Sequence, residues 1–419
     1  MLPFSLSSSV RPFTLLIPLL LIQVNSSAAN MDAKALSSAV AKFSAKFCNE
    51  LDKSKSVVSS PLSAEYLLAL LALGTTEPAH SELLTALDIP DNDSIRSSFG
   101  AVSAKLKGIK GVTFNVANKI YIKDGGYELV PELKEDAEKV FDAEFEKVDF
   151  DNSAAAADLI NKWVENKTNE KIKDLLSSDS FNADTRLVLV NALYFKGNWK
   201  TQFDAMNTIE QPFHIDAQTS VNIPMMFQEE KFKYGESSDL QAQLLEMKYE
   251  GGDASMVIVL PNEIDGLDGV MQKLADGYDL MSEVEKMFST KVKVTLPKFK
   301  IETEIDLMEV LPQLGIKAIF GHGDSGLSKI LNTGEPLYVS KAVQKAYIEV
   351  NEEGAEAAAA TASMVRTRRS ASWVREFVVD RAALWCVCVA RVPALAAVFR
   401  AARPARPARP APRAPRAEL

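Results

Sequence analysis

The sequence of 419 residues is poor in the side chains that enzymes most often use for catalysis, with only three histidines and three cysteines. A nucleophilic hydrolase needs a base beside its nucleophile. His80, His214 and His322 lie in no recognisable triad motif, and no Gly-x-Ser-x-Gly elbow occurs. The sequence also lacks a phosphate-binding glycine loop and a His-Glu-x-x-His motif. We therefore predict a protein that is not an enzyme and that binds no metal or cofactor.

The cysteines are too few for a disulfide framework. Cys386 and Cys388 stand one residue apart in an apolar run, which is a poor spacing for zinc. Cys48 lies on the apolar side of a predicted helix, where we expect a buried thiol.

Basic residues are scarce in most of the chain. The formal net charge is −9, although twelve arginines lie between Arg366 and the C-terminus. The remainder is therefore strongly acidic and would repel nucleic acid, anionic membranes and polyanionic cofactors. We expect none of these partners, and we expect a monomer.

Long hydrophobic runs are also lacking. The apolar stretch 12–24 follows Arg11 and precedes small residues at 25–29, as in a secretory signal peptide. It is too short to span a bilayer. We predict that residues 1–29 are removed and that the protein is secreted into the extracellular space. The sequons at Asn92 and Asn166 are then candidate glycosylation sites.

The apolar pattern predicts an α+β protein with one large domain. Apolar residues recur at spacings of three and four over 34–51, which indicates an amphipathic helix. A helix that is apolar nearly all round follows Pro61, and another helical stretch covers 155–177. Short β-rich runs come later, at 187–190, 254–260 and 292–296. Helices first and strands later, without a βαβ rhythm, favour the α+β class.

Residues 355–367 have two different faces if they form a strand. Every second residue from Ala355 to Thr367 is small or β-branched, without charge or proline. The alternate face carries Glu356, Met364 and Arg366, which water would accept. This segment can enter a sheet with one face buried, although an alanine-rich run equally suits a helix or a linker.

Residues 352–361 (EEGAEAAAAT) resemble the hinge of the reactive-centre loop of inhibitory serpins. Residues 59–63 (SSPLS) resemble the shutter motif of that family, and residues 191–199 (NALYFKGNW) are similar to its strand motif near the breach. The resemblance extends from about residue 35 to about residue 381, and it implies a serpin domain over residues 30–381. It implies a metastable fold of three β-sheets and eight or nine helices, with an exposed reactive-centre loop at about 352–376.

The resemblance also implies roles for individual residues. A protease cleaves the loop, and the hinge then inserts into a sheet as a new strand before the acyl-enzyme is hydrolysed. Gln344 stands where the family usually has a shutter histidine, and we expect it to preserve hydrogen bonding with altered energetics of sheet opening. The implied hinge residues are Glu353, Gly354, Ala355, Glu356, Ala357, Ala358, Ala359, Ala360 and Thr361. The implied shutter and breach residues are Ser60, Ser63, Asn191, Trp199 and Gln344.

The bait residue in this loop is an arginine by either way of counting. The usual spacing from Gly354 gives Arg368, whereas counting back from Phe377 allows Arg368 or Arg369, with Ser370 following. An arginine cation suits the acidic pocket of a trypsin-like serine protease. Residues 366–369 (RTRR) also fit a furin-like convertase, which is the second candidate target.

The end of the chain departs from the family pattern. Residues 400–419 consist almost wholly of Ala, Arg and Pro and should be disordered. We expect residues 382–419 to form an atypical tail in which 382–389 supplies at most one strand and nothing supplies a second. This keeps two alternatives open beside the inhibitor: a non-inhibitory carrier or chaperone with this fold, and a nonproductive splice variant.

Overall fold

The computed structural model describes residues 33–402 except 183, 333–336 and 355–373. Within these residues the chain forms nine α-helices, in agreement with the eight or nine expected. They are α1 (Ala33–Asn49), α2 (Pro61–Leu73), α3 (Ala79–Leu87), α4 (Asn92–Lys107), α5 (Pro131–Asp136), α6 (Ser153–Lys167), α7 (Leu267–Ala275), α8 (Leu280–Lys286) and α9 (Leu307–Val310). None of the helices described has both the length and the apolar character needed to cross a membrane.

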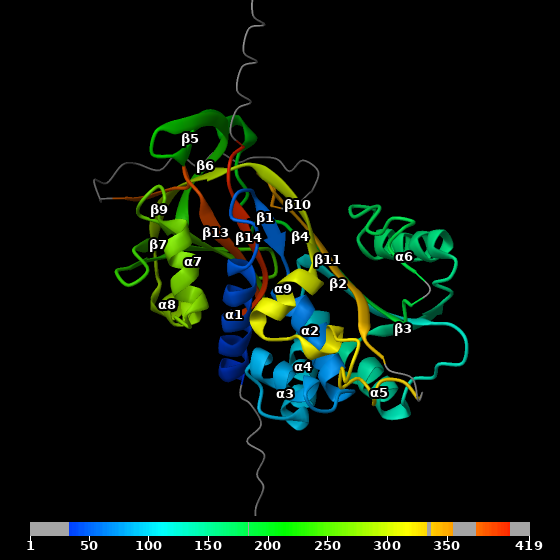
Figure 1. The fold of residues 1–419 in the computed structure, drawn as a ribbon. Helices are drawn as coiled ribbons and strands as arrows, with labels where there is room; N and C mark the ends of the chain where they lie inside the picture. The colour runs from blue at the N-terminus through cyan, green and yellow to red at the C-terminus, as the bar shows by residue number, and fades with distance from the viewer. Residues whose placement is uncertain (1–32, 183, 333–336, 355–373, 403–419) are drawn as a thin grey trace, which may run out of the picture.

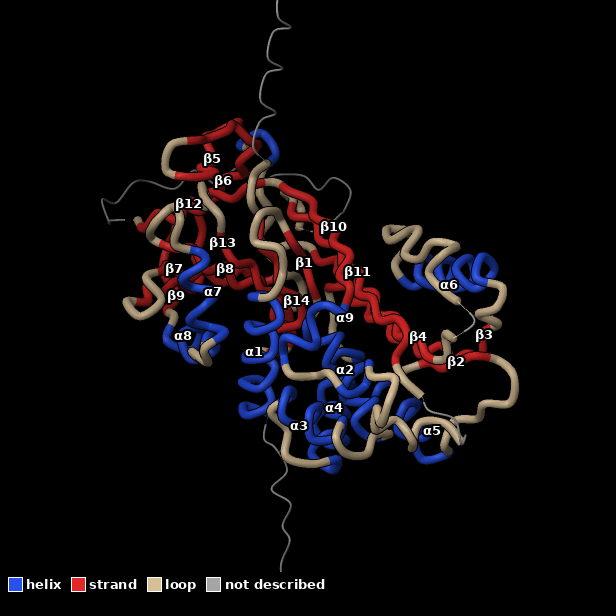
Figure 2. The backbone as a smooth tube through the Cα atoms, viewed as in Figure 1, coloured by secondary structure: helices blue, strands red, loops and turns tan. Residues whose placement is uncertain are grey.

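In the described part of the chain, fourteen strands form two hydrogen-bonded sheets (Figures 1 and 2). The five-stranded sheet has the order β10-β11-β4-β2-β3. The nine-stranded sheet has the order β1-β14-β13-β8-β7-β6-β9-β12, with β5 paired to β6. The strands are β1 (Val57–Ser59), β2 (Val112–Lys123), β3 (Glu144–Val148), β4 (Leu187–Gly197), β5 (Ile209–Asp216), β6 (Thr219–Ser237), β7 (Ala242–Lys248), β8 (Ala254–Pro261), β9 (Phe288–Pro297), β10 (Phe299–Asp306), β11 (Val339–Val350), β12 (Arg375–Val378), β13 (Ala383–Val389) and β14 (Val392–Phe399).

Two of the three expected sheets are continuous here. The reason is the length of β6, which pairs with β5 at its start and with β7 at its end, while β9 pairs along its middle. A strand of 19 residues can belong to both layers because it twists along its length.

The first two helices form as their apolar patterns predict. In α1 the residues Leu36, Val40, Phe43 and Phe47 are buried, at the spacing of one helical face. In α2 every residue from Pro61 to Ala72 is buried, so this helix lies inside the protein. Its N-terminus is capped by Ser60, whose side chain accepts a hydrogen bond from the Ser63 N–H.

The five-stranded sheet is covered on both faces, which explains the continuous apolar run in its central strand. In β4 all residues from Leu187 to Phe195 are buried. Val188 and Val190 pack in one cluster with Ile160 and Val164 of α6. Leu187, Leu189 and Leu193 point to the opposite side, into the main core that contains α2.

The helical stretch expected at 155–177 is shorter than predicted. The helix α6 ends at Lys167 because Thr168 turns its hydroxyl back onto the Val164 carbonyl, at 2.7 Å. Asn169 and Glu170 then adopt left-handed backbone angles, which no helix continues.

The prediction for the C-terminal end was wrong over residues 382–402. Two strands are present there, and they lie inside the nine-stranded sheet beside α1 (Figure 1). β13 pairs antiparallel with β8 and β14, and β14 also pairs with β1. All seven residues of β13 are buried, as are seven of the eight in β14. Residues 403–419 lie outside the described part.

The second strand, β14, was not predicted because its residues are rich in alanine. Ala has a low strand propensity in general. Here Ala394 and Ala396 are buried where β14 contacts α1 and α2, and small side chains allow that close layer contact, whereas Ala397 is buried on the opposite face beside Trp385. The hairpin turn is Ala390-Arg391, with both residues at positive φ (48° and 69°), which non-glycine residues adopt at a cost. The structural basis for a nonproductive variant, a missing sheet strand, is therefore removed.

Candidate functional site

The predicted shutter residues come together in the interior. We define the shutter cluster as Ser60, Ser63, Asn118, Asn191 and Gln344, all of which are buried. Ser60 and Ser63 lie at the start of α2, whereas the other three lie on adjacent strands β2, β4 and β11. The strand register places Asn118 opposite Asn191, and Asn191 opposite Gln344. Three amide side chains therefore form a row across the sheet.

Gln344 uses each of its polar atoms in this cluster. Its Oε1 accepts a hydrogen bond from the Ser60 N–H at 2.9 Å. Its Nε2 donates to the Ser60 carbonyl at 2.9 Å and to Asn191 Oδ1 at 2.8 Å. Gln344 thus joins β11 both to β4 and to the start of α2, and a glutamine satisfies the position fully.

The remaining bonds complete the cluster. Asn191 Nδ2 donates to Ser63 Oγ and to Asn118 Oδ1. Ser60 Oγ donates to the Ala394 carbonyl at 2.7 Å. The shutter cluster is therefore tied to β14, in the part of the chain where we expected no second strand.

A second constellation lies at the C-terminal ends of β4 and β11, where the breach was predicted. Trp199 is buried and stacks on Tyr249, with ring centroids 4.6 Å apart and an interplanar angle of 10°. Its Nε1 donates to the Asn351 carbonyl at 3.0 Å, and its backbone N–H donates to the Glu353 carbonyl at 2.8 Å. Trp199 therefore holds the segment that follows β11 against the segment that follows β4.

Gly354 is the last described residue of the segment after β11, and it also contacts the segment after β4. It forms an isolated bridge with Asn198 and has a φ of +129°. A Cβ at this position would stand 2.1 Å from the Gly197 carbonyl oxygen, so only glycine fits. The predicted reactive-centre loop therefore begins at a fixed point between β4 and β11.

Glu352 anchors the same segment through its side chain, a role that was not predicted from the residue pattern. Its carboxylate accepts a hydrogen bond from Thr208 Oγ1 at 2.8 Å and pairs with Lys298 Nζ at 2.9 Å. Partial burial opposes ionisation, but the Lys298 ammonium and the hydrogen bonds outweigh it and lower the pKa of Glu352.

The loop rejoins the protein on the other sheet. Arg375 begins β12, which pairs in parallel with β9. The Arg375 guanidinium pairs with Glu236 at 2.8 Å and lies over the Tyr234 ring at 5.0 Å. The loop thus connects the end of the five-stranded sheet with the edge of the nine-stranded sheet.

Two of the predicted hinge residues lie in the described part of the chain. Glu353 and Gly354 are described above. The other hinge residues (Ala355 to Thr361) and the candidate reactive bond (Arg368, Arg369 and Ser370) lie outside the described residues.

The two sequons differ in their surroundings. Asn166 is exposed in the last turn of α6. Asn92 is half-buried in the first turn of α4, and its Oδ1 is buried without a hydrogen-bond partner in the described part of the chain. Asn166 is therefore the more accessible position.

The thiols and acidic groups of the described residues are not arranged as a metal centre. Over the ranges described, no cluster of three or more His, Cys, Asp or Glu side chains is arranged to hold a metal ion. The three cysteines are free. Cys48 is half-buried and contacts Ser59 Oγ at 3.4 Å, and burial raises the pKa of its thiol to about 12.

Comparisons with known proteins agree with this architecture. The family profile described as Serpin (serine protease inhibitor) matches residues 38–388. Antitrypsin of Bombyx mori is 43% identical over 343 residues, which cover 81% of this chain and 86% of that protein. Alaserpin of Manduca sexta is 42% identical over 324 residues, which cover 77% of this chain and 82% of that protein. The crystal structure of Serpin48, a highly specific serpin of the insect Tenebrio molitor, matches with a TM-score of 0.80 and 34% identity, over 89% of this chain and 100% of that one.

Proposed function

This chain belongs to the serpin family, and we propose that it is a secreted inhibitor that traps serine proteases cleaving after arginine. The observation that carries the proposal is the parallel pair β4–β11 with Gly354 fixed at its C-terminal end. A segment that leaves Gly354 and turns back between these strands would run antiparallel to both.

Strand pairing gives this insertion a driving force. Parallel pairing is slightly less stable per residue than antiparallel pairing. Insertion would replace one parallel contact by two antiparallel contacts, and would bury the small face that begins at Ala355. The face of β4 that carries Val190 and Ala192 is already buried under α6, which favours small incoming side chains.

The shutter cluster sets the barrier to insertion. The β4–β11 pair extends from Val339 and Leu187 to Tyr347 and Tyr194, and Gln344 bonds to Asn191 within it. This pair must separate before a strand can enter. The protein therefore remains in its five-stranded form until the loop is cut and one end of the loop is free.

The chemistry of trapping follows from this order of events. The protease serine would attack the carbonyl carbon of the bait arginine and release the residue that follows it as a new N-terminus. The arginine would remain esterified to the enzyme while the hinge inserts and carries the enzyme with it. Hydrolysis fails if insertion distorts the protease before water attacks the ester.

The expected targets are trypsin-like enzymes, with furin-like convertases second. An arginine at position 368 or 369 presents a guanidinium to an acidic specificity pocket. The similarity to a protein named Antitrypsin supports the first class.

A denaturing gel tests the proposal directly. The purified protein is mixed with trypsin, and separately with furin. We expect a boiling-resistant band at the summed mass with trypsin. Complete loop cleavage without that band would identify a non-inhibitory substrate or carrier and would contradict trapping.

A matched pair of variants tests insertion itself. Ala359 lies on the face predicted to be buried on insertion, whereas Ala360 lies on the opposite face. We expect Ala359→Arg to turn the inhibitor into a substrate, because a buried unpaired charge opposes insertion. Ala360→Arg should still form the complex. Equal behaviour of the two variants would contradict the strand alternation.

Single substitutions locate the bait residue. Arg368→Ala should slow complex formation with trypsin at least about 100-fold, because the acidic pocket is left without its cation. Arg369→Ala should have a small effect. The reverse result assigns the bond to Arg369.

Secretion and glycosylation are tested by expression in insect cells. We propose that residues 1–29 are removed on export and that Asn166 carries a glycan. The secreted protein should begin near residue 30, and Asn166→Gln should abolish its shift on glycosidase treatment. A shift lost only in Asn92→Gln would overturn the assignment to Asn166.

A further inference from the structure

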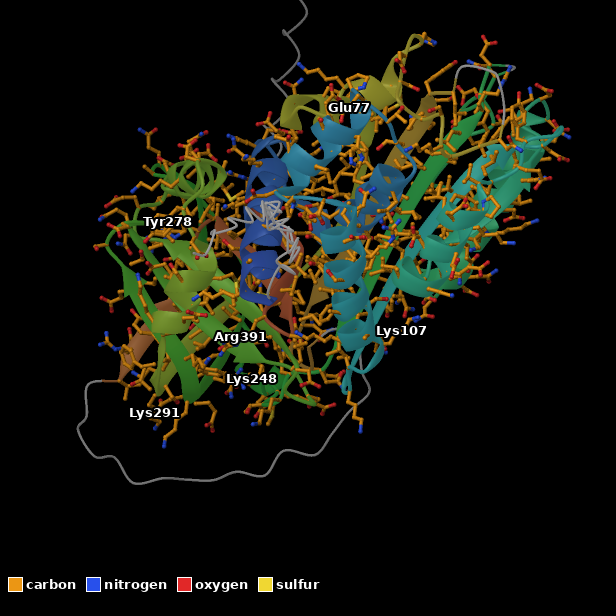
Figure 3. All side chains as sticks on the ribbon, turned by 90° about the horizontal axis from the view of Figure 1, so that it is seen from below. Glu77, Lys107, Lys248, Tyr278, Lys291 and Arg391 are labelled. Atoms are coloured by element: carbon orange, nitrogen blue, oxygen red, sulfur yellow. The ribbon has the colours of Figure 1, made fainter. Side chains whose placement is uncertain are left out.

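A large cavity opens between the helices and one end of the nine-stranded sheet. Its volume is about 760 Å³, which lies in the range of small-molecule sites. Its lining comes from α1, α4, α8, β8 and the β13–β14 hairpin and includes Ser37, Val102, Ser255, Met281 and Cys388. Arg391, at the hairpin turn, lies at the surface beside it with 76% of its side chain exposed (Figure 3).

A pair of thiols stands at the wall of this cavity. Cys386 and Cys388 are both 4% exposed, and their sulfur atoms are 3.9 Å apart. Both side chains lie on the face of β13 that the helices cover, opposite the face of Trp385. Only Cys388 lines the large cavity. Cys386 faces a second cavity of about 30 Å³, together with Cys48, which has room for little more than a water molecule.

The two thiols are also chemically unequal. The contact between the two sulfur atoms, in which either can donate, and burial together raise the pKa of Cys386 well above its ordinary value. Cys386 therefore keeps its proton until a partner sulfur is in place. The sulfur that a small molecule in the large cavity can reach is that of Cys388.

We propose that Cys388 is a modification site for low-molecular-weight disulfides that enter the cavity, and that Cys386 resolves the adduct to a Cys386–Cys388 disulfide. In the first step the Cys388 thiolate attacks one sulfur of the disulfide, and the S–S bond of that molecule breaks. A mixed disulfide forms at Cys388, and the leaving thiolate takes the proton that Cys388 gave up.

In the second step Cys386 gives up its proton and attacks the Cys388 sulfur. The mixed disulfide bond breaks, and the second thiol leaves with that proton. Overall the two protein thiols are oxidised to one disulfide, and the small disulfide is reduced to two thiols. The oxidant is the small disulfide itself, so no other reactant is needed.

The strand has a place where it can accommodate the new bond. A disulfide requires the two sulfurs to approach by about 1.9 Å from their present separation. The β13–β14 register is irregular between Val387 and Cys388, because Ala394 is an extra residue in β14. Such bulges absorb local bending that a regular ladder would resist.

The same bulge links the thiols to the shutter cluster. The carbonyl of Ala394 accepts the hydrogen bond from Ser60 Oγ. Contraction of β13 opposite this residue would displace that carbonyl. We therefore expect oxidation to lower the thermal midpoint of the native protein by weakening the Ser60–Ala394 bond.

The test uses the full-length folded protein with glutathione disulfide as the probe, followed by mass spectrometry. We expect the wild-type protein to lose two hydrogens, with the bond mapped to Cys386 and Cys388. Cys386→Ser should stop at one glutathionyl group on Cys388. Cys388→Ser should react at least about tenfold more slowly, because the remaining thiols are buried and protonated.

Cys48→Ser is the matched control and should react as the wild type does. Circular dichroism of each variant before treatment shows that it is folded. Ser60→Ala already lacks the bond to Ala394, so oxidation should lower its midpoint less than that of the wild type. The proposal is overturned if the folded protein is not modified, if Cys48 carries the modification, or if the adduct on wild-type Cys388 is never resolved.

Discussion

Glu65 provides a direct test of how burial tunes the stability of this protein. It lies on α2, is 1% exposed, and neither of its carboxyl oxygens has a hydrogen-bond partner among the described residues. Burial raises the pKa of Glu65 well above its ordinary value. The folded state therefore favours the protonated carboxyl, whereas the unfolded chain ionises near its reference pKa of about 4.3.

The sign of the pH dependence follows from that raised pKa. The contribution of the protonated Glu65 carboxyl to the free energy of unfolding is fully present below the pKa that Glu65 has in the unfolded chain. It is lost as the pH rises toward the pKa that Glu65 has in the folded protein. Each pH unit in that window removes about 1.4 kcal/mol of stability. In addition, leaving the two oxygens unpaired costs about 1–3 kcal/mol at any pH.

Two substitutions separate these effects. Glu65→Gln removes the titration but leaves a buried polar group, so it should match the wild type near pH 4.5 and exceed it increasingly toward pH 7. Glu65→Met removes both costs and should be the more stable protein at each pH, by about 1–3 kcal/mol near pH 4.5. Glu77 is exposed (Figure 3), and Glu77→Gln should leave the profile unchanged.

The assay is urea unfolding of the native state, followed by tryptophan fluorescence at several pH values between 4.5 and 7.5. The quantity of interest is the difference between wild type and variant, because other titrating groups then cancel. A difference between wild type and Glu65→Gln that is constant with pH would refute the reasoning. It would mean that the carboxyl has a partner or is hydrated.

Three further predictions concern the shutter cluster, the loop anchor and the C-terminal hairpin. Gln344→Ala leaves the Ser60 backbone and Asn191 unpaired, and we expect a loss of about 2–4 kcal/mol in the first unfolding transition. Lys298→Ala should cost at most about 1 kcal/mol at pH 7, because the lysine is half exposed. That difference should shrink as the pH falls below about 4.5, since Glu352 has a lowered pKa and its pairing is lost on protonation. Truncation after Val389 removes β14 and should prevent folding, as judged by size-exclusion chromatography and circular dichroism, whereas truncation after Ala402 should not.

Specific results would contradict these predictions. A Gln344→Ala protein with wild-type stability would show that water replaces the amide without cost. A Lys298→Ala difference that grows in acid would mean that Glu352 is stabilised by other groups. A folded protein lacking β14 would show that β1 and β13 need no strand between them.

The sequence motifs identified residues that the structure brings together, but not how these residues bind one another. Residues 59–63 and Gln344 were assigned to the shutter and residues 191–199 to the breach, and the structure places Ser60, Asn191 and Gln344 in one hydrogen-bonded cluster. Local sequence carries this information because caps and strand motifs are local signals.

Other members of the site depend on strand register, which the sequence does not display. Asn118 joins the shutter cluster only because it stands opposite Asn191 across β2 and β4. Lys298 reaches Glu352 although 54 residues separate them, because Phe299 at the start of β10 pairs with Val350 at the end of β11. A one-residue slip of either strand would turn these side chains to the other face.

The C-terminal hairpin shows that strand propensity alone does not predict every strand of this protein. Residues 392–399 contain three alanines and a proline and resemble no strand in isolation. They form one because β1 and β13 offer unpaired edges on both sides, and the layer above requires small side chains. The tertiary contacts of β14, rather than its own sequence, therefore determine that it forms a strand.

The position of β14 in the chain has a consequence for how the protein is made. This strand pairs with β1, which was synthesised more than three hundred residues earlier, and it carries the carbonyl that receives the Ser60 hydroxyl. While the ribosome is still adding residues, β1 and β8 each have an open edge, and the start of α2 lacks one of its partners. The edges of β1 and β8 in the nascent chain therefore stay exposed and prone to aggregation until β13 and β14 have been synthesised. Chaperones that bind exposed strands can therefore act on this protein throughout its synthesis, until its C-terminal strands pair.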